Sequence, residues 1–150
     1  MKTLKILLDT SVYSAMLDKR DPIRQKQTQD FWKNIDKYEL FFSNINKEEI
    51  EAIKEEKLKK RMKDFLIKGK ELEITEEVEQ MKSFYIKEEL IPEKFENDAL
   101  FLALTTVYSI DILISWNFKH LVKRKTRIGV NLINLKEGYK PIEILAPPEV

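Results

Sequence analysis

Three acidic residues stand at positions that would carry them into a common site. Asp9 directly follows an apolar run, Glu49 comes shortly after a second, and Asp98 opens a third. An acid at the end of a buried strand, or in the first turn of the next helix, lies at the edge of a parallel sheet where ligands bind. Converging carboxylates repel one another unless a cation lies between them. The pattern therefore predicts a site for a hard cation such as Mg²⁺ or Mn²⁺.

The composition excludes several other chemistries. The chain has no cysteine, and its single histidine is His120. Disulfides, thiolate metal sites, a cysteine nucleophile and a multi-histidine metal cage are therefore excluded. Metal-assisted hydrolysis of a phosphodiester needs only carboxylates, waters and the phosphate itself. Asp9, Glu49 and Asp98 are accordingly the candidate metal ligands, either directly or through water.

Each acid also has a structural interpretation. Asp9 can cap the helix that follows it. Glu49 stands three residues after Asn46, the spacing of a capping box. Asp98 in a first helical turn interacts favourably with the helix dipole. The conjunction of the three acids is what favours a functional site.

Helix and strand signals alternate along the chain, which predicts an α/β fold. We expect a doubly wound, three-layer α/β/α architecture with a central, mostly parallel sheet, forming a single domain over residues 1–150. Strands are predicted at 4–8, 40–43, 72–74, 112–114 and 142–145. Helices are predicted at 10–17, 22–35, 46–55, 58–68, 75–90, 98–108 and 129–136, with Asn46 and Asn97 at two of their starts.

Charge is unevenly distributed although the net charge is only +1. Residues 119–127 carry five cations and no acid, directly beyond the strand expected at 112–114. If that strand ends at the acidic crevice, these cations can hold phosphates. The basic helix around 57–63 has two interpretations, a binding surface for RNA or a protein partner and an ordinary solvated face.

Four segments together resemble a known family, the PIN domains. Residues 7–12 match its first motif, in which an Asp ends the first strand, and residues 42–50 match the second, with an acid before an aliphatic residue. Residues 97–104 match the third, an Asp-Ala pair that opens an apolar helix. Residues 115–121 resemble the fourth, although Asn117 stands where many members carry an Asp. The resemblance spans almost the whole chain, in the family's order and spacing.

The resemblance implies an activity, a cofactor and partners. Similar proteins are ribonucleases that depend on Mg²⁺ or Mn²⁺, and many are VapC-type toxins of toxin–antitoxin pairs. It implies that Asp9, Glu49 and Asp98 hold the metal, with Asn117 as a fourth catalytic residue. It further implies an RNA substrate, a cognate antitoxin and a homodimer. For self-association we expect apolar side chains of the early helices, including Tyr13, Met16 and Leu17.

Neighbouring residues are candidates for supporting roles. Hydroxyls near the acids can orient them, and polar residues of the fourth motif can contact substrate. Trp116 has two interpretations, stacking on a base and packing in the core. The supporting candidates are Thr10, Ser11, Ser115, Lys119 and His120, each of which also has a structural interpretation as a cap, turn or core residue.

Two functions from different classes fit these residues. The first is an endoribonuclease that hydrolyses RNA phosphodiester bonds as the toxin of a type II pair. The second is a PIN-fold module that binds RNA or protein with weakened or absent nuclease activity. A phosphatase or DNA nuclease using the same acids is a third reading. No stretch is long and apolar enough for a membrane span, and Asp9 interrupts any signal-peptide pattern, so we expect a cytoplasmic protein without membrane contact.

Overall fold

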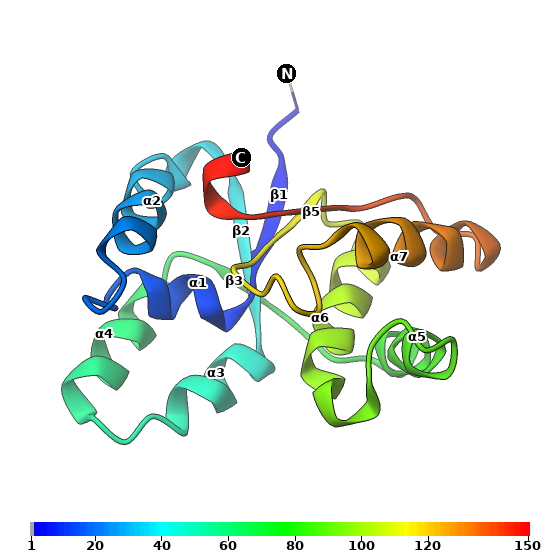
Figure 1. The fold of residues 1–150 in the computed structure, drawn as a ribbon, viewed down its shortest axis with the longest axis horizontal. Helices are drawn as coiled ribbons and strands as arrows, with labels where there is room; N and C mark the ends of the chain where they lie inside the picture. The colour runs from blue at the N-terminus through cyan, green and yellow to red at the C-terminus, as the bar shows by residue number, and fades with distance from the viewer. Residues whose placement is uncertain (1) are drawn as a thin grey trace.

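The computed structural model describes residues 2–150, which form a five-stranded sheet with helices on both faces (Figure 1). Neighbouring strands are all parallel, and their order across the sheet is β3-β2-β1-β4-β5. The predicted three-layer α/β/α fold is confirmed. The strands are β1 (Lys5–Leu8), β2 (Glu39–Ser43), β3 (Lys70–Leu72), β4 (Ile112–Ile114) and β5 (Glu143–Leu145).

The central strand β1 is where the chain changes its direction of winding. Strands β2 and β3 are added on one side of it, and β4 and β5 on the other. At such a switch point the connections leaving the two neighbouring strands diverge, and a crevice opens at the carboxyl ends of the strands. Leu8 pairs with Ile114 in register, so Asp9 and Ser115 enter this crevice side by side.

The strands are apolar because both faces of the sheet are covered. Ile6, Leu7 and Leu8 of β1 are fully buried, and so are Leu113 and Ile114 of β4. Continuous burial of this kind is typical of a parallel sheet between two helical layers, where polar alternation is absent. The sheet is therefore a rigid support for the residues that follow its strands.

Two groups of helices form the outer layers. Helices α1–α4 cover one face of the sheet and α5–α7 the other, as right-handed crossovers require (Figure 1). Among residues 2–150, no helix combines the length and the apolar composition needed to span a lipid bilayer. The helices are α1 (Thr10–Ala15), α2 (Pro22–Trp32), α3 (Asn44–Glu51), α4 (Glu56–Leu66), α5 (Glu76–Lys87), α6 (Glu96–Val107) and α7 (Arg124–Lys136), with short 3₁₀ turns at Ile35–Lys37, Glu93–Phe95 and Pro147–Glu149.

Helix α6 is the most deeply buried helix segment around the candidate site. Residues 99–106 are all buried, because α6 lies between β4 and α5. A helix that is apolar on every side must be enclosed in this way. Its first turn, which carries Asp98, is less buried and opens toward the crevice.

The structural interpretation of Asn46 and Glu49 as a capping box is wrong. Helix α3 begins earlier, with Ser43 as its N-cap: the Ser43 hydroxyl accepts from the Ile45 amide at 3.2 Å. Asn46 is then the third helical residue, and its Oδ1 accepts from the Ser43 amide at 2.9 Å. Glu49 therefore has no capping role and is available to the crevice. Asn97 also fails as a cap, because α6 already begins at Glu96.

The apolar residues proposed for self-association on the early helices are mostly buried. Tyr13 is fully buried and Met16 is 6% exposed, while Leu17 is half-buried. The Tyr13 ring lies 6.1 Å from Trp32 and 6.3 Å from Phe65, centroid to centroid, because α1 packs against α2 and α4. The expectation that these side chains form an exposed face for self-association was therefore wrong for Tyr13 and Met16, which face the core.

Candidate active site

Asp9 lies at the carboxyl end of β1 and is held from both sides. Its amide donates to the carbonyl of Ile114 at 3.1 Å, which extends the pairing between β1 and β4 by one residue. Its Oδ1 accepts from the amide and the hydroxyl of Ser11, and its Oδ2 accepts from the Ser115 hydroxyl at 2.5 Å. The residue is only 4% exposed. Its carboxylate therefore has a fixed orientation before any ligand arrives.

The two serines also tie the loops after β1 and β4 together. The Ser11 hydroxyl accepts from the Trp116 amide at 3.0 Å, and the Ser115 hydroxyl accepts from the Asn117 amide at 2.8 Å. Each serine thus accepts from backbone while donating to Asp9. Both serines were expected to lie beside the acids, and the structure brings them into direct contact with Asp9.

Asn117 joins the loop after β4 to the first turn of α6. Its Nδ2 donates to Oδ2 of Asp98 at 3.2 Å. Its Oδ1 accepts from the amides of Lys119 at 3.1 Å and His120 at 2.9 Å. The two backbone amides fix which end of the side-chain amide faces Asp98, so the amide orientation is determined by its partners.

Glu49 approaches from α3 on the other side of Asp9. The Thr10 hydroxyl donates to Oε1 of Glu49 at 2.6 Å, and it accepts from Nδ2 of Asn46 at 3.2 Å. The same Asn46 amide donates to the carbonyl of Leu8 at 3.1 Å, which holds α3 against the end of β1. Sequence reasoning missed this role of the fully buried Asn46; its only signal was its position shortly after a strand that ends in serine.

The three acids lie close enough to repel one another. Burial raises the pKa of Asp9 to about 6, with the Ser11 and Ser115 hydrogen bonds opposing the shift and the charges of Asp98 and Glu49 adding to it. Burial also raises the pKa of Asp98 to about 6, opposed by Asn117 and reinforced by Glu49. The sheet edge therefore gathers negative charge in a poorly solvated place, which a cation would relieve.

The donor set suits a hard cation without forming a complete cage. Within residues 2–150, no three His, Cys, Asp or Glu side chains are arranged as a ready-made metal site. Mg²⁺ is usually held by one or two carboxylates, with waters and substrate phosphate completing an octahedron, so a closed cage is not required. Oxygen atoms surround the crevice, from Asp9, Asp98, Glu49 and adjacent hydroxyls, and these residues fit such an ion.

Cations lie on the α6 side of the acids. The His120 ring packs against the Phe95 ring with centroids 4.2 Å apart. The ammonium groups of Lys94 and Lys119 lie 5.2 and 5.8 Å from the centroid of the Phe95 ring. Burial, and then the charges of Lys119, Lys123 and Lys94, lower the pKa of His120. His120 is 8% exposed, and its Nε2 has no hydrogen-bond partner among the described residues.

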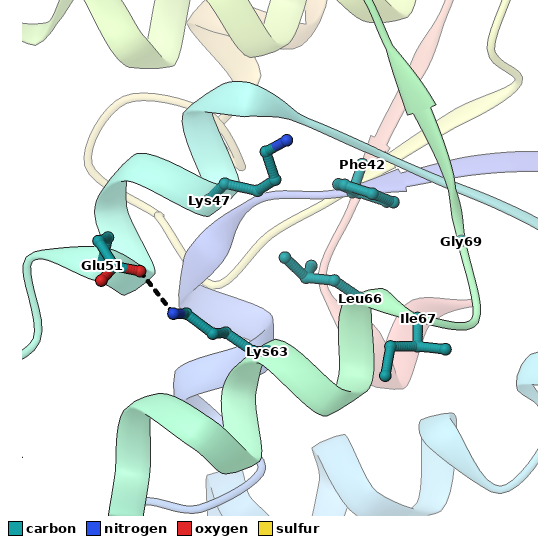
Figure 2. A pocket seen from close by; sticks show the side chains of 7 residues that line it. All are labelled: Phe42, Lys47, Glu51, Lys63, Leu66, Ile67 and Gly69. Atoms are coloured by element: carbon teal, nitrogen blue, oxygen red, sulfur yellow. Dashed lines mark ion pairs between the residues drawn. The ribbon is translucent and has the colours of Figure 1, made fainter. Parts of the chain in front are cut away.

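A separate hollow of 510 Å³ lies away from the acids, between α3, α4 and the start of β3 (Figure 2). Its floor is apolar, with Phe42 and Leu66. Across it, Lys63 of the basic helix α4 donates to Glu51 of α3 at 2.6 Å. Lys59 also approaches Glu51, at 3.7 Å. These cations of the 57–63 segment are thus partly neutralised by the protein, which favours its interpretation as a solvated face.

The chain was compared with known proteins. No protein-family model and no curated protein matches it. Among solved structures, a chain of a toxin–antitoxin complex from Klebsiella pneumoniae matches with a TM-score of 0.56 and 17% identity, over 77% of this chain and 88% of that one. The chain has a PIN-like fold. At 17% identity, the likeness to this structure establishes the fold alone.

Two further structures agree over more of the chain. One is VapBC2 from Rickettsia felis, bound to a DNA fragment from its promoter, with a TM-score of 0.57, 13% identity and coverage of 94% of this chain and 97% of that one. The other is DNA-bound VapBC from Salmonella typhimurium, with a TM-score of 0.58, 16% identity and coverage of 97% and 99%. The expected resemblance to VapC-like PIN domains is confirmed in the fold.

Proposed function

We propose that the protein is a metal-dependent endoribonuclease. The observation that carries this proposal is that Asp9, Glu49 and Asp98 bring their charges to one crevice, where burial, reinforced by the charge of Glu49, raises the pKa values of Asp9 and Asp98 to about 6. Acids that are costly to ionise in a crevice are candidates for a functional site. Mg²⁺ or Mn²⁺, when bound, would supply an activated water and relieve charge on the phosphoryl oxygens.

The protein residues have distinct proposed roles. Asp9, Glu49 and Asp98 would hold the ion, directly or through water. Ser11 and Ser115 would keep both oxygens of Asp9 oriented. In the same way the Thr10 hydroxyl would orient Glu49, and Asn117 would orient Asp98. Such supporting hydrogen bonds normally set the geometry of a metal site.

RNA as substrate is supported by the lysines beside Phe95 and His120. Lys94 and Lys119 lie on the same Phe95 ring, and Lys123 adds its charge at His120, so we call these three residues the lysine cluster. Asn117 connects the loop that carries Lys119 and His120 to Asp98. Lys94 and Lys119 are exposed and free to meet phosphates. A strand held there by its backbone would present one phosphodiester to the acids.

Cleavage of single-stranded RNA by the purified protein with Mn²⁺ tests the proposal. We expect Asp98→Asn to remove cleavage, while the matched Asp64→Asn, at an exposed position on α4, retains it. A DNA oligonucleotide of the same sequence separates RNA from DNA hydrolysis. Equal cleavage by both variants, after removal of contaminating nucleases, would refute the assignment.

We further propose that the protein, over residues 1–150 as one unit, is the toxin of a toxin–antitoxin pair. The three structural neighbours are complexes of that kind, which supports an antitoxin as partner. Exposed apolar side chains on α7 support a homodimer: Ile128 is 49%, Leu132 62% and Leu135 76% exposed. Expression alone should arrest growth, and co-expression of the antitoxin should restore it.

The alternative function is a binding module without strong nuclease activity. Two observations favour it: Asp9, Glu49 and Asp98 already accept hydrogen bonds from within the protein, and Asn117 adds no fourth charge. In that case RNA would bind in a gel-shift assay while remaining intact with Mn²⁺. The cleavage assay above therefore decides between the two functions.

A further inference from the structure

A second feature adjoins the acidic crevice on the α2 side of Asn117. The guanidinium of Arg24 lies over the ring of Trp116, 4.7 Å from its centroid, and 5.9 Å from the centroid of Phe118. Trp116 is buried, and Phe118 is 49% exposed. The inner face of the guanidinium is thus covered by aromatic rings, and we call Arg24, Trp116 and Phe118 the stacking platform.

The platform is held in place by hydrogen bonds from α2. The Trp116 indole donates to the Thr28 hydroxyl at 2.8 Å, and that hydroxyl donates to the Arg24 carbonyl at 2.6 Å. The Arg24 amide donates to Asp21, the N-cap of α2, at 3.0 Å, and the Arg24 Nε lies 3.7 Å from the same carboxylate. Because α2 and the loop after β4 are joined in this way, the guanidinium has little freedom to leave the rings.

A hollow of 360 Å³ opens beside the platform and borders the surroundings of the acids. Its lining includes Ser11 and Asn117, which contact Asp9 and Asp98 respectively. Arg24 and Trp116 of the platform also line it, and so do Asp18 and Asp21. An RNA chain that leaves the acids past Asn117 therefore meets a planar cation and two carboxylates that can accept hydrogen bonds.

We propose that this hollow binds one nucleobase of the RNA strand, next to the phosphodiester held at the acids. The base stacks on Arg24 of the stacking platform, as bases stack on aromatic rings and guanidinium planes in other proteins that bind single strands. Asp18 and Asp21 accept hydrogen bonds from its exocyclic amino group. The inference rests on the proposed function for the identity of the strand.

The charges favour a base over a phosphate in this hollow. Arg24, which lines the hollow, is already paired with Asp21 at 3.7 Å, and Asp18 is paired with Arg20 at 2.9 Å, so the hollow offers a phosphate little free positive charge. The lysine cluster on the other side of Asn117 attracts phosphates instead. Carboxylates accept but do not donate, so they suit adenine, cytosine and guanine, which carry amino groups. Uracil has only a single ring N–H and should bind most weakly.

The chain offers a direct reporter of this site. It has two tryptophans, Trp32 and Trp116, so Trp32→Phe leaves Trp116 as the only indole. In a Trp32→Phe/Asp98→Asn protein, which we expect not to cleave RNA, Trp116 fluorescence is titrated with the four ribonucleoside 5′-monophosphates and with ribose 5-phosphate. We expect saturable changes with the amino-bearing bases, a weaker response to uridine monophosphate and little response to ribose 5-phosphate.

Arg24→Lys tests the platform itself, because it keeps the charge and removes the plane. We expect nucleotide binding to weaken by roughly 5-fold or more, the lower range of base stacking in single-strand binding proteins. The matched control is Arg61→Lys, the same change at an exposed position on α4, which should bind like the parent. Thermal scans of both variants confirm that they are folded.

Three outcomes would overturn the proposal. Equal binding of ribose 5-phosphate would make this a phosphate site, and unchanged affinity in Arg24→Lys would remove the platform. An absence of nucleotide binding, with Arg24→Lys weakening only antitoxin association, would assign the surface to a protein. These results are independent of cleavage: base binding without RNA hydrolysis would leave the hollow assigned and refute only the nuclease function.

Discussion

The side chain of Asn117 connects Asp98 to the loop after β4 through both ends of its amide. Its Nδ2 donates to Asp98 Oδ2 at 3.2 Å, and its Oδ1 accepts from the His120 amide at 2.9 Å. An aspartate can make the second contact but not the first, because an ionised carboxylate has no donor. The amide therefore positions Asp98 without adding a charge to the crevice.

Asn117→Asp should strengthen Mn²⁺ binding and weaken the metal-free fold. The new carboxylate keeps the backbone contacts at Lys119 and His120 but faces Asp98 with a like charge. Calorimetric titration should show tighter Mn²⁺ binding, and thermal scans without metal at neutral pH should show a lower Tm than the parent. Affinity no better than the parent's would place Asn117 outside the metal's surroundings.

The acids should make the metal-free protein less stable as the pH rises. Burial raises the pKa of Asp9 to about 6 in the folded protein, so the folded state keeps a proton that the unfolded chain has already released. The free energy of unfolding then falls between about pH 4 and pH 6, and this contribution stays lost above that range. A shift of roughly two pKa units corresponds to about 3 kcal/mol for Asp9 alone.

Asp9→Asn removes this titration while leaving the other two acids in place. The Tm difference between the parent and Asp9→Asn should change across about pH 4 to 6. The Tm of the parent should fall relative to that of Asp9→Asn as the pH rises. Parallel curves would mean that Asp9 has an ordinary pKa. Added Mn²⁺ should raise the parent's Tm more above pH 6 than below about pH 5, since the ion binds the ionised acids and only the folded state.

Ser115→Ala should reduce activity without removing the acid. It deletes the donor to Asp9 Oδ2 and the acceptor of the Asn117 amide, so the carboxylate loses one fixed oxygen. Loss of such a supporting contact typically costs about 10- to 100-fold in metal affinity or activity. Ser83→Ala is the control, because Ser83 is exposed on α5 and its hydroxyl donates to the Glu79 carbonyl of the same helix. Similar activity of the two variants would contradict the role given to Ser115.

How far the sequence predicts this molecule depends on whether a residue acts locally or across the sheet. The apolar run at residues 4–8 predicts the strand β1, and the parallel sheet then places Asp9 beside the end of β4. The start of α3 was misjudged because Ser43 and Asn46 are both good capping residues, and only the chain's path after β2 selects Ser43. The contacts of Arg24 with Trp116 and Phe118 could not be predicted, because they join segments about ninety residues apart with no periodic signal.

The lysine cluster gives the last prediction, which concerns salt. If Lys94 and Lys119 hold RNA phosphates, each should contribute to the number of counterions released on binding. In the Asp98→Asn background, where we expect no cleavage, the logarithm of the RNA affinity should fall linearly with the logarithm of the salt concentration. Lys94→Ala and Lys119→Ala should each make that slope shallower by up to about 1, and should weaken binding similarly for all sequences. Lys60→Ala, at an exposed position on α4, should leave the slope unchanged. A slope that responds to Lys60 but not to the cluster would move the RNA to the face of α4 and separate it from the acids.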